Sequence, residues 1–144
     1  MRVVVQRVNH AKCIIDNKIF SEINNGYMLL VSFTHSDTIE VVNKMIKKIF
    51  NFRIFEDQNG KMNLNISQVN GEILSISQFT LYANCNDGNR PSFVNAMNPI
   101  NATKLYDYFN KEMNKLVPVK TGVFGADMDI DFINHGPSTF LLEF

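Results

Sequence analysis

Tryptophan, cysteine, net charge and long apolar runs are scarce in this sequence. Its 144 residues include no tryptophan and two cysteines, Cys13 and Cys85, and 14 basic side chains balance 14 acidic ones. Two cysteines do not form a disulfide framework, so we expect free thiols in a reducing, cytoplasmic location. No stretch reaches the roughly 18 apolar residues of a membrane span, and we expect no membrane partner. Because the net charge is zero, binding to a long nucleic-acid duplex is not favoured.

The composition is that of an ordinary globular protein. Hydrophobic residues make up 45% and charged residues 19% of the chain, and the length fits one domain over residues 1–144. The segment Met1–Arg7 lacks the long apolar core of a signal peptide and is expected to be the first strand. If the protein contacts RNA, we expect it to hold a short end of the molecule.

Alternating and β-branched patterns predict many short strands. Two pairs of them flank the turn signals Asp16-Asn17 and Asp57–Gly60, which predict hairpins. The predicted strands are Met1–Val8, Ala11–Ile15, Lys18–Ile23, Tyr27–Phe33, Phe52–Glu56, Lys61–Ile66, Glu72–Phe79, Val119–Phe124, Asp127–Asn134 and Thr139–Phe144.

Two amphipathic helices are predicted between these strands. Asp37 is the expected N-cap of a helix over residues 38–50, with Glu40 completing a capping box. Asn98-Pro99 opens a second helix, since proline is favoured at the first helical position. The expected apolar stripes are Ile39, Val42, Ile46 and Ile49, and then Ala102, Leu105, Phe109, Met113 and Leu116. The fold class is therefore α+β, with a mainly antiparallel sheet that is barrel-like or forms two packed sheets.

Histidines and carboxylates give no clear catalytic or metal-binding pattern. His10, His35 and His135 fall in three predicted turn regions without a partner at metal-ligand spacing. A Ser-His-Asp triad stays open, although the chain has no G-x-S-x-G elbow. Asp127, Asp129 and Asp131 share one strand face, which we interpret as solvated in preference to a cation site. No metal and no cofactor are expected.

Two segments are candidates for chemistry. Residues 75–83 place small polar side chains where a strand leaves the sheet, and backbone N–H groups there could stabilise an oxyanion. Polar residues 83–98 follow as a long loop, which is often functional. In Asn134–Thr139, Gly136-Pro137 indicates a tight turn whose X-Pro bond can be cis. From the pattern alone, we favour a plain hairpin turn for this second segment over a functional role.

Short strings along the whole chain resemble the D-aminoacyl-tRNA deacylase family. They occur in the family's order and at its length. The strings are Met1–Val8, Asn51–Asp57, Gly60–Asn63, Ser77–Ala83, Arg90–Phe93, Thr121–Met128 and Asn134–Thr139.

This resemblance implies a homodimeric enzyme that acts on the aminoacyl ester of tRNA. Ser77, Gln78, Phe79 and Thr80 match the segment that holds the ester and the terminal adenosine. Phe124 and Met128 match positions near the adenine and the pocket wall. Gly136 and Pro137 match a Gly-cis-Pro element that enters the active site of the opposite subunit, and Arg7 matches a residue that steadies it. The sequence departs from the family at Ser138, where valine is common, and at His135, where aspartate is frequent.

The expected chemistry is stereoselective hydrolysis. Thr80 is a candidate nucleophile by type, but no base is clearly placed to activate it. We therefore expect Thr80 to orient the substrate while the ribose 2′-hydroxyl assists attack. The carbonyls of Gly136-Pro137 are expected to reject L side chains and to admit D side chains and glycine. A non-catalytic tRNA-end binding module and a general esterase are the rival interpretations.

Overall fold

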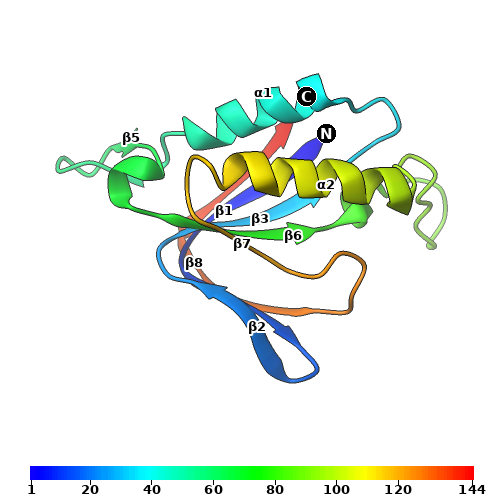
Figure 1. Ribbon diagram of the computed structural model, residues 1–144, viewed down its shortest axis with the longest axis horizontal. Coiled ribbons are helices and arrows are strands. Elements are labelled where there is room, and N and C mark those ends of the chain that lie inside the picture. The colour runs from blue at the N-terminus through cyan, green and yellow to red at the C-terminus, as the bar shows by residue number, and fades with distance from the viewer.

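The computed structural model describes residues 1–144 as a strongly curved six-stranded sheet with two α-helices on one face (Figure 1). A separate two-stranded sheet is formed by β4 and β5. The elements are β1 (Arg2–Ile15), β2 (Lys18–Ile23), β3 (Gly26–Ser32), α1 (Ile39–Phe50), β4 (Phe55–Glu56), β5 (Met62–Leu64), the 3-10 helix η1 (Ser67–Val69), β6 (Glu72–Ser77), the 3-10 helix η2 (Phe79–Tyr82), α2 (Pro99–Met113), β7 (Val119–Thr121) and β8 (Asp129–Glu143).

Strand β1 is the centre of the sheet, whose order is β2-β1-β3-β6-β7 with β8 also paired to β1. Its first half pairs with β3, its second half with β2, and β8 follows it on the other side, all antiparallel. The pairs β3–β6 and β6–β7 are parallel, because the segments containing α1 and α2 return the chain to the same end of the sheet. The predicted α+β class with a mainly antiparallel sheet is confirmed.

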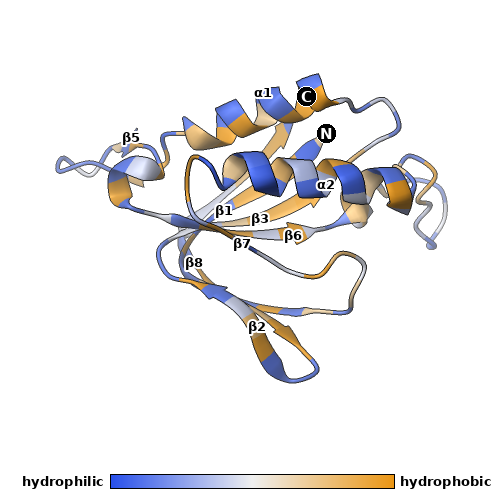
Figure 2. Cartoon of the chain, in the orientation of Figure 1, coloured by the Kyte–Doolittle hydropathy of each residue, from blue (hydrophilic) through white to orange (hydrophobic).

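The sheet curls until its far strands meet, which gives it a barrel-like shape. Ser21 of β2 donates its hydroxyl to the carbonyl oxygen of Thr121 in β7 at 2.8 Å. The larger core fills the space between the sheet and the helices, and a smaller core that includes Cys13 and Met28 fills the inside of the curl. Figure 2 shows both helices turning hydrophobic faces towards the sheet.

The chain has fewer, longer strands at its two ends than the patterns predicted. Apart from Met1, the predicted strands Met1–Val8 and Ala11–Ile15 are parts of one strand, β1, so His10 lies within a strand and not in a turn. The predicted strands Asp127–Asn134 and Thr139–Phe144 likewise belong to one strand, β8, except for Asp127, Met128 and Phe144. The register between β1 and β8 shifts twice, between Gln6 and Ala11. Such bulges interrupt the alternation of side chains without ending a strand, and the sequence pattern then looks like two strands.

The N-cap of α1 differs from the prediction, whereas α2 begins as expected. The N-cap of α1 is Thr38, whereas Asp37 accepts hydrogen bonds from the amino group of Met1 at 2.6 Å and from the Thr34 N–H at 2.8 Å. The predicted capping by Asp37 is therefore wrong. Asn98 caps α2 as expected by accepting from the Asn101 N–H at 3.0 Å. No helix in the structure is long and apolar enough to cross a membrane.

The apolar stripe of α2 also differs from the prediction. Tyr106 is buried together with Ala102, Phe109 and Met113, while Leu105 is only partly buried. Leu116 lies beyond the end of the helix and is exposed. The error arises because the tyrosine has a hydrogen-bond partner in the core, which a hydrophobicity pattern does not reveal.

Among the glycines, Gly26 is the one where an added Cβ would make the closest contact. It lies between Val8 of β1 and Glu72 of β6, and an added Cβ would overlap the backbone carbonyl oxygen of Glu72. We expect Gly26→Ala to lower the free energy of unfolding by about 3 kcal/mol, measured by urea denaturation. Gly60→Ala is the control, since Gly60 has a φ of 71° but open space around an added Cβ, and it should cost about 1 kcal/mol. Equal losses would contradict the packing explanation.

Candidate active site

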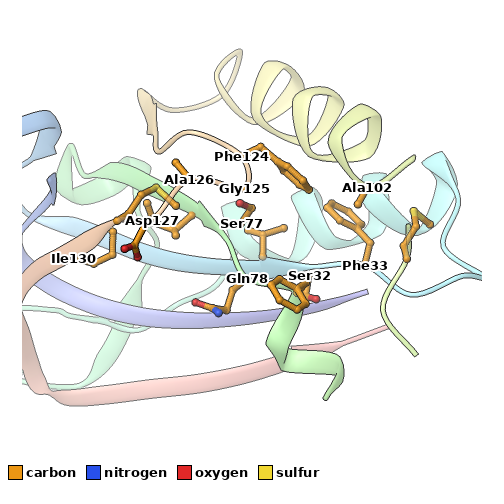
Figure 3. A pocket seen from close by; sticks show the side chains of 15 residues that line it. Ser32, Phe33, Ser77, Gln78, Ala102, Phe124, Gly125, Ala126, Asp127 and Ile130 are labelled. Atoms are coloured by element: carbon orange, nitrogen blue, oxygen red, sulfur yellow. The ribbon is translucent and has the colours of Figure 1, made fainter. Parts of the chain in front are cut away.

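A cavity of about 270 Å³ opens where β3 and β6 end, below α2 and the loop between β7 and β8 (Figure 3). Ten of its 15 lining residues are hydrophobic. Such a cavity suits a largely apolar ligand group that is oriented by a few polar atoms. Five of the site residues predicted from the sequence line it, namely Ser77, Gln78, Phe79, Phe124 and Met128.

The end of β6 brings the first three of these residues to the cavity. After Ser77 the chain leaves the sheet, and the Gln78 N–H donates to the Val31 carbonyl of β3 at 2.8 Å, which ties the departing segment to the neighbouring strand. Phe79 then begins η2 and is 56% exposed, with its ring in edge contact with Phe93 at 4.9 Å between centroids. The predicted strand Glu72–Phe79 therefore ends two residues early.

Thr80 lies beside the cavity but does not line it. Its hydroxyl oxygen accepts a hydrogen bond from the Gln78 side-chain amide at 2.6 Å. An amide cannot take the proton of the hydroxyl, so this contact orients Thr80 without activating it. The one ionisable residue in the cavity wall is Asp127.

The loop that covers the cavity is held down at Gly122 and Phe124. The Gly122 N–H donates to the Ser75 carbonyl at 3.1 Å, and an added Cβ there would lie 2.5 Å from the Met128 sulfur. Phe124 packs against Tyr106 at 5.8 Å between ring centroids. Burial raises the pKa of the Tyr106 phenol, which donates to the Ser75 carbonyl at 2.7 Å. Because β7 ends at Thr121, Phe124 belongs to this loop and not to the predicted strand.

Gly136 and Pro137 form an exposed corner within β8, which we call the Gly-Pro corner. The peptide bond between them is cis, and Gly136 has a φ of 123°. Val8 pairs with Asn134 and Gln6 with Thr139, so both flanks of the corner pair with β1 and the expected hairpin turn is absent. Neither residue lines the cavity of its own chain.

Arg7 lies beneath the Gly-Pro corner and is 2% exposed. Its guanidinium donates to the His135 carbonyl at 3.1 Å and to the Ile54 carbonyl at 2.8 Å, and it pairs with Glu56 at 3.4 Å. The corner is also closed from within, because the Ser138 N–H donates to the Asn134 side chain at 3.0 Å. Buried Arg7 thus connects β1, the segment before β4 and the residue that precedes Gly136.

The remaining candidate residues do not gather into a second site. His35 and His135 are exposed, and no group of three or more histidine, cysteine or acidic side chains is arranged to hold a metal ion. Asp129 and Asp131 are exposed along β8, as a solvated face requires, whereas Asp127 precedes the strand and lines the cavity. Burial raises the pKa of the Cys13 thiol, and Cys85 is exposed; both are free.

The sequence patterns missed the opposite wall of the cavity. Figure 3 shows Ser32 and Phe33 at the end of β3 and Ala102 on the first turn of α2. These residues belong to ordinary strand and helix patterns, so nothing distinguished them from core positions. Only the packing of α2 over β3 turns them into cavity wall.

Comparisons with known proteins agree with one another over the full chain. A family model described as D-Tyr-tRNA(Tyr) deacylase matches residues 4–143. D-aminoacyl-tRNA deacylases of Lactobacillus gasseri and Bacillus cytotoxicus are 52% and 50% identical over 144 residues, covering 99% of this chain and of each relative.

Solved structures share the fold. A protein named c-Myc DNA Unwinding Element Binding Protein superimposes with a TM-score of 0.94 at 36% identity, covering 99% of this chain and 98% of that one. A probable eukaryotic D-amino acid tRNA deacylase superimposes with a TM-score of 0.86 at 17% identity, covering 98% and 97%. Because the family model and the relatives of about half identity span nearly every residue, including those of the cavity, the chain belongs to the D-aminoacyl-tRNA deacylase family of hydrolases.

Proposed function

We propose that the protein hydrolyses the ester bond of D-aminoacyl-tRNA and releases the free D-amino acid and the tRNA. The observation that carries this proposal is the cavity at the end of β6, where Ser77, Gln78 and Phe79 meet Phe124 and Met128 in a member of the deacylase family. One small cavity and a net charge of zero suit the terminal aminoacyl-adenosine of an RNA better than a long duplex.

The reaction needs a placed water molecule and stabilisation of negative charge. Water attacks the ester carbonyl carbon, a tetrahedral oxyanion forms, and the ribose oxygen leaves with a proton. The first N–H groups of a helical turn have no acceptor within it, and in η2 they belong to Phe79 and Thr80. We assign these two groups to the oxyanion, where one well-placed donor contributes about 3–4 kcal/mol. Thr80 orients the substrate, and the ribose 2′-hydroxyl assists attack.

Selection of the D form is assigned to the Gly-Pro corner of a second copy of the chain. The corner is exposed, is anchored from below by Arg7, and stands apart from the cavity of its own chain. These features fit a rigid group that enters the cavity of the other subunit in a homodimer. Its carbonyls exclude an L side chain at the α-carbon, whereas a D side chain points outward and glycine has none. Glycyl-tRNA is therefore a second substrate.

Substrate stereochemistry gives the first prediction about activity. Incubation with D-tyrosyl-, glycyl- and L-tyrosyl-tRNA should accelerate loss of the first two esters over the enzyme-free rate and leave the third unchanged, as measured by release of labelled amino acid. A tRNA-end binding module would accelerate none of them. A general esterase would cleave the D and L esters alike.

Thr80 gives the second prediction. If its hydroxyl only orients the substrate, Thr80→Ala should lower kcat/KM for D-tyrosyl-tRNA by about 10-fold, as loss of one neutral hydrogen bond does. Thr80→Ser keeps the hydroxyl and is the matched control, with activity close to wild type. Complete inactivity of Thr80→Ala, together with an acyl-threonine adduct in the wild-type mass spectrum, would assign Thr80 as the nucleophile instead.

The Gly-Pro corner gives the third prediction. A Cβ on Gly136 would lie 2.6 Å from the Ser138 hydroxyl and 3.0 Å from an Arg7 nitrogen, at a φ of 123°. We expect Gly136→Ala to lower kcat/KM for D-tyrosyl-tRNA roughly 10-fold more than Ser138→Ala does, because displaced groups orient substrate poorly. Comparable losses of kcat/KM in the two variants would contradict the proposed role of the Gly-Pro corner in the reaction.

Mixed dimers test whether the corner acts on the other subunit. After Gly136→Ala and Thr80→Ala chains are dissociated together and reassociated, about a quarter of all sites combine an intact Thr80 with an intact partner corner. Activity should then exceed the mean of the two variants assayed separately. No gain on mixing, or full activity in a stable monomer, would show that the corner does not act across subunits.

A further inference from the structure

Two serine hydroxyls, those of Ser32 and Ser75, are buried in the protein without any hydrogen-bond partner. Ser32 is 2% and Ser75 0% exposed. A buried hydroxyl normally has a partner, since an unpaired one destabilises the folded state. Ser32 lines the cavity, whereas Ser75 does not.

Ser32 is held in a fixed place in the cavity wall. It is the last residue of β3, and its neighbours on both sides are tied to other walls of the cavity. The carbonyl of Val31 accepts from the Gln78 N–H at 2.8 Å, and the carbonyl of Phe33 accepts from the Met97 N–H at 2.9 Å. Figure 3 shows Ser32 next to Gln78, at the edge of the labelled cavity residues.

We propose that the Ser32 hydroxyl is a binding group for the terminal adenosine of the substrate, which supplies the missing hydrogen-bond partner. This inference rests on the proposed function. A serine hydroxyl donates one hydrogen bond and accepts two, so it complements a base nitrogen or a ribose hydroxyl. Around it the cavity is mostly apolar, with Phe33, Ile76 and Phe124 among its walls, as expected for a base oriented by a single buried polar group.

The nucleoside is the part of the substrate that fits here. At about 270 Å³ the cavity is slightly smaller than most ligand sites, which span roughly 300–1,000 Å³, so it suits one nucleoside and no longer segment of RNA. The D side chain points outward past the Gly-Pro corner in the proposed function. The buried hydroxyl is therefore left for the adenosine.

A ligand-binding role for Ser32 predicts opposite effects on stability and on binding. Removing the unpaired hydroxyl in Ser32→Ala should raise the Tm of the free protein. The same change should raise KM for D-tyrosyl-tRNA about 3- to 10-fold, with kcat within about two-fold, because a group that binds ground state and transition state equally changes KM alone. Ser75→Ala is the matched control, with a raised Tm and an unchanged KM.

Titration with adenosine 5′-monophosphate, followed by NMR chemical shifts, tests the site without catalysis. Ser32→Ala should weaken this binding about 3- to 10-fold, and Ser75→Ala should leave it unchanged. Equal effects of the two variants on KM and on nucleotide binding would overturn the role of Ser32. If the wild type binds the nucleotide through Ser32 but leaves D-tyrosyl-tRNA intact, the proposed function fails and the nucleoside site stands.

Discussion

The pairing of β1 with three other strands is the constraint on which the rest of the molecule depends. β3 and β2 share one edge of this strand and β8 occupies the other, so the sheet must curl over its length. The curl lets the helices cover one face and creates the cavity at the ends of β3 and β6. The same pairing holds both flanks of residues 135–138 against β1, and the extra residues between those flanks form the exposed Gly-Pro corner over Arg7.

The chemistry of the cavity follows from how few ionisable groups it contains. Its wall includes one carboxylate, that of Asp127, and no histidine. An aminoacyl ester is already reactive towards water, so orientation and stabilisation of the oxyanion are enough, and no strong base is required. The hydroxyl of Thr80 is restrained by the Gln78 amide, and this arrangement is consistent with a binding and orienting role.

The cavity and the Gly-Pro corner are built differently, which fits the different tasks proposed for them. Strand ends, a loop and a helix meet at the cavity, whose shape depends on contacts such as those of Tyr106 with Ser75 and Phe124. The corner is a short excursion of one strand, fixed by the buried charge of Arg7 and by Asn134. A fixed backbone corner suits discrimination by shape at the aminoacyl end of the proposed ligand. A cavity lined by side chains suits close contact with its adenosine end.

The sequence by itself determined the α+β class, both helices, the hairpins at Asp16-Asn17 and Asp57–Gly60 and, through its resemblance to a family, five residues of the cavity. Those features depend on local periodicity, turn residues and short strings, which are properties of neighbours in the chain. Only the tertiary structure decided that β1 and β8 are continuous, that Asp37 binds the amino terminus, and that Ser32, Phe33 and Ala102 complete the cavity. Bulges, buried hydrogen bonds and cavity walls depend on residues that are far apart in the chain, and no local pattern records which of them meet.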